Sequence, residues 1–246
     1  MPLPDLITIH DTYLMFTRVA RERFAGALGG RLLLQSGFDA QGAAAVSAGA
    51  IAGAASLSID ADAALLRQAL RTGLCDFVVT HLDEALRILK NELRRRLPVS
   101  VCLCADPQRA FADMIERGVQ PDFFSAGGRE GAAPGGAIQT FTARGAILLP
   151  ADSAPSQGTS MLSWKVAVDA ARTIPQIAAI AAGSLDPSRN DTPARQHWLR
   201  TAPRYLGRAF GSRHCLRMTE QETNAFLERM QAEIPGVAIT RDGNFA

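Results

Sequence analysis

Residues 30–62 constrain the fold of this chain more than any other stretch. The apolar run Leu32 to Ser36 is bounded by glycines and is too short for a helix, which predicts a buried β-strand. After Gly37, residues 42–55 are almost all Ala, Gly, Ser, Val and Ile, and such small side chains let a helix pack tightly against a parallel sheet. A second short strand then ends at Asp60. This order is typical of a βαβ nucleotide-binding unit.

The glycine turn after the first strand indicates where a ligand would bind. Gly37 allows a sharp turn, and Gly42 lets a backbone come close to a phosphate or a packed strand. A helix N-terminus near Gly42 would present N–H groups and a positive dipole end to an anion. Asp60 lies 18 residues after Gly42. An acid about 20 residues beyond the glycine turn is where a ribose hydroxyl would be bound.

Asp39 departs from the dinucleotide fingerprint, because the chain reads G-x-D-x-x-G in place of G-x-G-x-x-G. A carboxylate beside a pyrophosphate is repulsive unless a cation neutralises it or it is turned away. The fingerprint therefore leaves two interpretations open, a nucleotide site and a strand–turn–helix unit that packs and binds nothing.

Composition limits the class of protein. The chain has 246 residues, enough for one large domain or two small ones, and its 47% hydrophobic and 20% charged residues are ordinary for a globular core. A net charge of +2 gives no reason to expect a nucleic-acid partner. Four cysteines without zinc-ligand spacing predict reduced thiols in a cytoplasmic protein and no metal site. No signal peptide or membrane-spanning segment is predicted.

The order of predicted elements favours an α/β fold. Helices are predicted over 11–28, 63–72, 82–95 (capped by Thr80) and 107–117, and strands over 77–79, 97–104 and 123–125. Such alternation predicts a doubly wound, mostly parallel, Rossmann-like sheet. Ligands of such sheets bind at the carboxyl ends of the strands, which places Gly37, Asp60, Asp106 and Ser125 near one rim.

The pattern changes after residue 126, and we expect a Rossmann-like domain over 1–150 and an added helical C-terminal region of unknown role over 151–246. The predicted elements are a loop over 126–137, a strand over 146–149, a linker over 151–160 and a helix over 161–182 with a kink or a break at Pro175. One or two short helices over 193–210, a helix from the Thr219 capping box to about 232, and an edge strand over 237–239 follow.

Other chemical candidates are weaker. His214 and Cys215 could be a base and a nucleophile, but adjacent residues rarely face one another, so a structural role is favoured. Asp60 and Asp62 could hold a cation, but two carboxylates alone do not make a site.

A basic stripe is a further candidate. Arg200, Arg204 and Arg208 fall four residues apart and could meet phosphates or an acidic partner, although a solvated helix face is the favoured interpretation.

Four stretches in a fixed order carry a family resemblance. They are Thr12 to Phe16 leading through Arg21 to Phe24 into Gly30 to Leu34, the glycine loop and Ala-rich helix followed by Asp60-Ala61-Asp62, Asp76 with Leu82 to Leu86, and Pro98 to Val101 followed by Arg117 to Asp122. Together they resemble the nucleotide-binding domain of urocanase (urocanate hydratase) over residues 12 to about 126.

The resemblance implies a cofactor and its contacts. In that family the domain binds NAD, whose nicotinamide acts as an electrophile toward the imidazole of urocanate in a hydro-lyase reaction of histidine catabolism. By position, the cofactor-binding residues would be Gly37, Phe38, Ala40, Gln41, Gly42, Asp60 and Asp106. Asp60 takes the place of a ribose-binding glutamate, and Asp106 takes the place of an asparagine near the cofactor. No catalytic residue is assigned.

Departures from the family pattern separate three hypotheses. The family's loop "GLGGMGGAQP" is replaced by residues 37–46, its "DQTSAHDP" is replaced from Ala126 onward, and its substrate domain has no counterpart. The first hypothesis is a shortened paralogue that still binds NAD or a related nucleotide. The second is a non-catalytic relative that has lost the nucleotide and uses the fold for interaction, as a homodimer through its C-terminal helices. The third is a lyase acting on a urocanate-like substrate.

Overall fold

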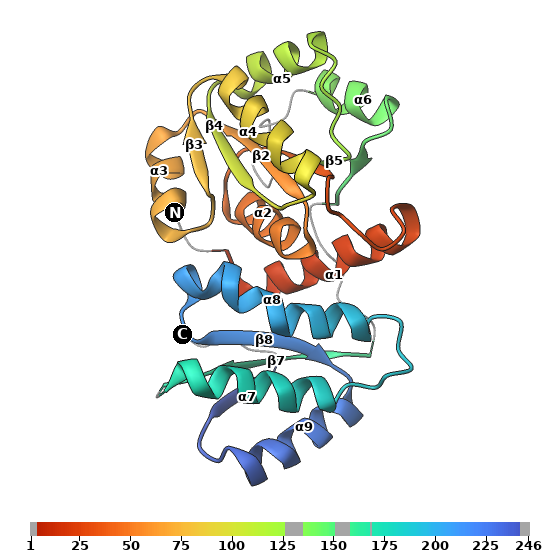
Figure 1. Cartoon of the computed structure of the whole chain (residues 1–246), viewed down its shortest axis with the longest axis vertical. Coiled ribbons are helices and arrows are strands. Elements are labelled where there is room, and N and C mark those ends of the chain that lie inside the picture. Colours follow the sequence, from red (N-terminus) through yellow and green to blue (C-terminus); the bar gives the residue numbers. More distant parts are fainter. Residues whose placement is uncertain (1–3, 126–134, 151–157, 168, 242–246) are drawn as a thin grey trace. The chain divides into compact units, whose positions relative to one another are not determined.

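The computed structural model describes residues 4–125, 135–150, 158–167 and 169–241. These residues belong to two compact units, Met1–Ser153 and Ala154–Ala246 (Figure 1). Each unit has its own sheet, and each is described by itself below.

The first unit is built on a six-stranded sheet in the order β3-β4-β2-β1-β5-β6. The strands are β1 (Leu32–Ser36), β2 (Ala55–Asp60), β3 (Phe77–Val79), β4 (Ser100–Cys104), β5 (Phe123–Ser125) and β6 (Ile147–Leu148). Every neighbouring pair is parallel. The chain winds outward from β1 to one edge, then returns to place β5 on the other side of β1. This confirms the predicted doubly wound, Rossmann-like α/β fold.

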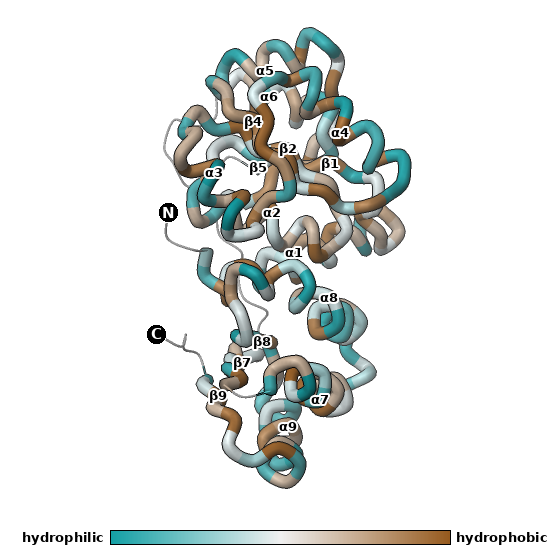
Figure 2. Tube along the Cα trace, turned by 60° about the vertical axis from the view of Figure 1, so that its left-hand side comes forward, coloured by the Kyte–Doolittle hydropathy of each residue, from teal (hydrophilic) through white to brown (hydrophobic). Residues whose placement is uncertain are grey.

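Six helices connect or flank these strands within the described part of the unit. They are α1 (Leu6–Arg23), α2 (Ala40–Ala52), α3 (Ala63–Thr72), α4 (Leu82–Arg95), α5 (Pro107–Glu116) and α6 (Gly135–Ala143). An apolar core cluster joins α4, α5 and α6 to the sheet. The Phe111, Phe124 and Phe141 rings pack together there, with centroids 5.6 to 6.3 Å apart. Figure 2 shows that β2 and β4 are among the most hydrophobic segments, as buried central strands require.

The small residues of α2 have the packing role that the sequence predicts. Its residues from Gly42 to Ile51 are all buried. A Cβ atom added at Gly49 would lie 3.5 Å from Leu33 on β1 and 3.8 Å from Phe16 on α1. The helix is therefore enclosed between the sheet and α1, and small side chains make that close approach feasible.

Three local predictions in this unit need correction. Thr80 does not cap α4, because the N-cap is His81 and the Thr80 hydroxyl instead contacts the His81 ring at 3.0 Å. The strand predicted over 97–104 begins at Ser100. Residues 135–137, predicted as loop, begin α6, while the rest of that predicted loop, 126–134, lies outside the described residues.

The second unit combines helices with an antiparallel sheet in the order β8-β7-β9. Its elements are β7 (Ser160–Lys165), α7 (Ala170–Gly183), α8 (Thr192–Phe210), β8 (Arg213–Met218), α9 (Glu220–Glu233) and β9 (Ala238–Arg241). The capping box of Thr219 and Glu222 and the strand near 237–239 are confirmed.

A purely helical description of this region is incomplete. Residues 161–165, predicted as helix, form β7, whose Met161, Leu162 and Trp164 side chains are buried. Strand β8 was not predicted. Helix α8 runs unbroken through Pro203, so residues 192–210 are one helix. Pro175 lies inside α7 without ending it.

Candidate functional site

The carboxyl ends of β1, β2 and β4 meet at one edge of the parallel sheet. Ser36 pairs with Ile59, and Asp60 pairs with Cys104, so the residues that follow these strands lie next to one another. The N–H of Gly37 donates to the carbonyl of Ile59 at 2.8 Å, and the N–H of Ala105 donates to the carbonyl of Asp60 at 3.2 Å. The structure thus places the glycine turn beside Asp60, with Asp106 beyond the end of the neighbouring strand.

Asp60 holds the glycine turn in place. Its Oδ2 atom accepts a hydrogen bond from the N–H of Phe38 at 2.9 Å, and its Oδ1 atom accepts one from the N–H of Asp62 at 2.8 Å. The residue is only 6% exposed. A carboxylate oxygen has two acceptor sites, so each oxygen retains one site that a ribose hydroxyl could use. The Asp60 carboxylate is therefore fixed beside the glycine turn, and its role as a ribose-binding acid stays a prediction.

Asp39 occupies the N-terminus of α2. It is the N-cap residue, and its Oδ1 atom accepts a hydrogen bond from the N–H of Gly42 at 2.8 Å. A pyrophosphate bound at a Rossmann helix uses this same group of N–H donors. The residue that breaks the glycine fingerprint therefore turns toward the helix and places its own negative charge at the anion position.

The packing around Gly42 favours glycine at this position. A Cβ atom at this position would lie 3.0 Å from Gln35 Nε2 and 3.0 Å from the carbonyl oxygen of Gly37. Gly37 has a positive φ of 77°, which favours glycine in this turn. The side chain of Phe38 is fully buried, whereas Ala40 and Gln41 in the first turn of α2 are partly exposed. The cofactor-binding role of these residues stays a prediction.

Gln35 is a candidate site residue that the sequence analysis missed. It is fully buried at the end of β1, and its Nε2 atom donates to the carbonyl of Ser36 at 2.9 Å. Its Oε1 atom has no hydrogen-bond partner within the described part of the chain. A buried, unpaired acceptor is uncommon and marks a position where a donor group would bind favourably. The signal in the sequence was an amide that follows three leucines in the same strand.

Aspartates cap all three helices that begin after β1, β2 and β4. Besides Asp39 on α2, Asp62 caps α3 by accepting from Ala64 and Leu65 at 2.9 and 3.0 Å, and Asp106 caps α5 by accepting from Arg109 at 2.8 Å. Each carboxylate compensates the positive end of its helix dipole. This edge consequently attracts anions less than the corresponding edge of a glycine-loop site. Among the described residues, no group of three potential ligands could hold a metal ion.

The candidates in the second unit do not form a catalytic pair. His214 and Cys215 are neighbours on β8, so their side chains point to opposite faces of the sheet. His214 stacks on Trp164, with ring centroids 6.2 Å apart, and burial lowers the pKa of its imidazole to about 4. Cys215 is fully buried.

The arginines of the basic stripe on α8 are exposed to solvent, as expected for a solvated helix face. Arg200, Arg204 and Arg208 are all exposed, and the Arg204 guanidinium lies 5.9 Å from the centroid of the neighbouring Tyr205 ring. No helix in the described ranges has both the length and the hydrophobicity needed to cross a membrane.

The sheet order, the helices between parallel strands and the glycine turn define the first unit as a Rossmann-like domain. Residues 8–127 match the family model described as the urocanase Rossmann-like domain. Residues 8–127 belong to that domain family, and the relation to urocanase is shown for this part of the chain. The match confirms the resemblance that the sequence order indicated.

Proposed function

We propose that this urocanase-related protein binds NAD or a related nucleotide at the carboxyl edge of its first sheet, without catalysing the hydratase reaction. The observation that carries the proposal is the fixed carboxylate of Asp60, which two backbone N–H groups hold beside the glycine turn. The Asp60 carboxylate would accept hydroxyl groups of the ribose, and the first turn of α2 would receive the pyrophosphate. The bound nicotinamide would supply an electrophilic ring, as it does in the urocanase family.

Asp39 would limit the affinity of this site. A pyrophosphate has to displace the Asp39 carboxylate from the Gly42 N–H and tolerate a negative charge nearby. We therefore propose that Asp39 acts as an internal competitor for the anion position. Replacing it by glycine would expose the helix N-terminus at little cost, because glycine is itself an acceptable N-cap residue.

An interaction role without a nucleotide is the second candidate. It is favoured by the three capping aspartates, which make the ligand edge acidic. In this case the chain would use its fold to bind a protein, such as a second copy through the C-terminal helices. Because its four cysteines are free thiols, we propose the cytoplasm as its compartment in either case.

The hydratase reaction itself, and with it a role in histidine catabolism, has less support. The carboxylates of Asp39, Asp60, Asp62 and Asp106 are each engaged by backbone N–H groups at this edge. No general acid for urocanate is therefore apparent among these residues. Loss of urocanate absorbance on addition of the pure protein would support the hydratase reaction, and a flat trace would count against it.

The test is to purify the full chain, identify small molecules released on denaturation by mass spectrometry, and titrate NAD calorimetrically into the wild type, Asp39→Gly and Asp62→Gly. Asp62 is the matched control, because it caps a neighbouring helix at the same edge. We expect Asp39→Gly to bind NAD about tenfold more tightly than the wild type and Asp62→Gly to bind it with little change. If neither the wild type nor Asp39→Gly binds NAD, nucleotide binding is refuted and the interaction role replaces it.

A further inference from the structure

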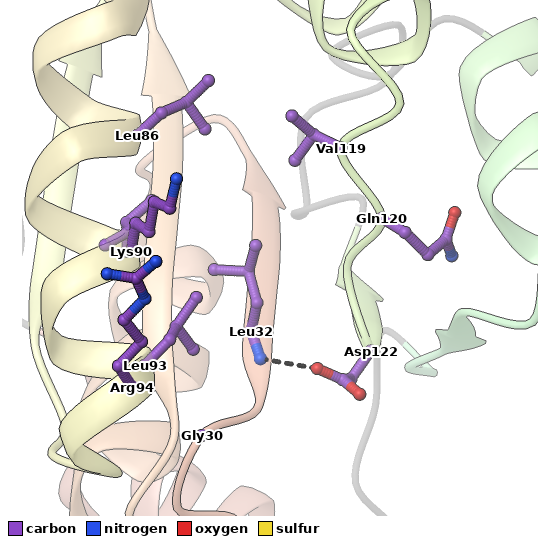
Figure 3. A pocket seen from close by; sticks show the side chains of 10 residues that line it. Gly30, Leu32, Leu86, Lys90, Leu93, Arg94, Val119, Gln120 and Asp122 are labelled. Carbon is purple, nitrogen blue, oxygen red and sulfur yellow. Dashed lines mark hydrogen bonds between the residues drawn. The ribbon is translucent and has the colours of Figure 1, made fainter.

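A second concave site lies in the first unit, outside the ligand edge described above. It is a groove of about 620 Å³ between α4 and the segment that leads into β5. Figure 3 shows Leu86, Lys90, Leu93 and Arg94 of α4 along one side, Val119, Gln120 and Asp122 along the other, and Leu32 between them. Gly30 and Leu32 stand before and at the start of β1, so the groove lies near the amino ends of β1 and β5, whereas Gly37 and Asp60 lie at the carboxyl ends.

The lining of the groove is mainly apolar and only partly covered. Leu32 and Leu89 are buried, while Leu86, Leu93 and Val119 are partly buried and pack against the core cluster of α4, α5, α6 and the sheet. Gly30 brings the backbone so close to α4 that an added Cβ atom would lie 3.2 Å from the carbonyl oxygen of Leu93. This apolar surface would gain favourable free energy from contact with an apolar ligand.

The polar groups on the β5 side of the groove are already engaged within the protein. Asp122 accepts from the Arg31 guanidinium at 2.9 Å and from the N–H of Leu32 at 2.8 Å. The amide of Gln120 donates to the carbonyls of Pro121 and Phe141 at 3.1 and 3.2 Å. Because the Asp122 carboxylate already has these donors, this side of the groove offers little attraction to a cationic ligand.

The two cations on the α4 side have no such partners. Lys90 and Arg94 are exposed, and neither side chain makes an ion pair or a hydrogen bond with any residue in the described ranges. They are four residues apart on one helix face, so both can reach one anionic group. An apolar floor beside two unpaired cations is complementary to a ligand with an apolar chain and an anionic head.

We propose that this groove binds a small soluble carboxylate with an unbranched apolar chain, with the carboxylate at Lys90 and Arg94 and the chain over Leu32, Leu86 and Leu93. Its volume falls within the usual range of roughly 300–1,000 Å³ for small-molecule sites. The α4 residues that line it, 86 to 94, span about 12 Å of helix, which suits a medium-chain acyl group. This site is independent of the NAD proposal, since it uses other residues at the other end of the strands.

The test is equilibrium dialysis of the full chain against radiolabelled decanoate, with Lys90→Glu, Arg94→Glu and Arg87→Glu as variants. Arg87 is an exposed cation on the same helix that does not line the groove, so its reversal changes the net charge equally and serves as the control. We expect Lys90→Glu and Arg94→Glu each to weaken decanoate binding about tenfold and Arg87→Glu to change it less than about twofold. Decanol, which lacks the charge, should compete poorly.

Three outcomes would overturn the proposal. The first is the absence of decanoate binding to the wild type. The second is an equal loss in all three variants, which would show only a general charge effect. The third is a self-association of the wild type that decanoate reverses and that Leu93→Ser abolishes, which would assign the groove to a second copy of the chain.

Discussion

Glu222 is a position in the second unit where replacing one carboxylate oxygen by an amide NH₂ group should be costly. Its side chain is 3% exposed and accepts four hydrogen bonds. Oε2 accepts from Arg195 Nη1 at 2.7 Å and the N–H of Thr219 at 2.8 Å, and Oε1 accepts from Arg195 Nη2 at 3.0 Å and the N–H of Asp186 at 2.8 Å. These bonds connect α8, α9 and the segment between α7 and α8.

Glu222→Gln keeps the shape of the side chain but cannot satisfy these donors. Each oxygen faces two N–H groups, so either orientation of the amide directs its NH₂ group toward two donors. The change also leaves the fully buried Arg195 without its closest carboxylate. Breaking a buried pair costs about 3–5 kcal/mol, and the remaining contacts of Arg195 with Asp191 and Thr192 place the expected loss near the lower figure.

The assay is urea unfolding followed by tryptophan emission. Both tryptophans of the chain, Trp164 and Trp198, belong to the second unit, so the signal reports that unit. With a slope of about 1 kcal/mol per molar urea, the loss corresponds to a midpoint lowered by about 3 M. Glu233→Gln on the same helix is the control, because Glu233 pairs with Arg229 where both are about half exposed, and its loss should stay below about 0.5 kcal/mol.

A loss of less than about 1 kcal/mol in Glu222→Gln would refute this reasoning. It would mean that the amide forms an arrangement with Arg195 other than the four hydrogen bonds that Glu222 accepts in this structure.

The ion pair of Glu222 with Arg195 also predicts a pH dependence of stability. Burial opposes ionisation of Glu222, but the hydrogen bonds from Arg195, Thr219 and Asp186 outweigh it and lower the pKa of the Glu222 carboxyl. The stability it contributes is present above its unfolded pKa and falls as the pH drops through the lower, folded pKa.

Two further predictions concern His214 and Gly42. Because burial lowers the pKa of His214 from 6.5 to about 4, the unfolded state binds a proton at a higher pH than the folded state, and the free energy of unfolding of the second unit should fall by about 2 kcal/mol between pH 7 and pH 5. His214→Phe, which keeps the stacking on Trp164, should remove that loss. If the urea midpoint of this variant depends on pH as steeply as that of the wild type, the prediction is wrong. Gly42→Ala should destabilise the first unit by about 1–3 kcal/mol, because the added Cβ atom would lie 3.0 Å from Gln35 and from the Gly37 carbonyl. Thermal unfolding followed by circular dichroism measures this loss. The control is Gly136→Ala, whose Cβ atom would have no neighbour within 4 Å.

Local signals in the sequence predicted most of the first unit. The apolar run before Gly37, the small residues of α2, the helix over 63–72 and the short strand at 123–125 are specified by neighbours in sequence. Their alternation sufficed for a parallel α/β fold, and their order sufficed for the family. The second unit was harder, because β7 and β8 pair Ser160 with Met218, and no local pattern of residues reveals a partner that distant in the chain.

The sequence by itself determined which residues surround the glycine turn, but only the tertiary structure decided their hydrogen-bond partners within the protein. From the sequence, Asp60 was a candidate ribose ligand and Asp39 was a charge that could repel a pyrophosphate. In the structure Asp39 caps α2, and Asp60 holds the turn by accepting from the N–H of Phe38. Likewise, Arg195 with Glu222 and the groove beside Lys90 join residues from separate elements. The physical reason is that a polar side chain takes the donors or acceptors that packing brings within reach, and packing is fixed only when the whole unit has folded.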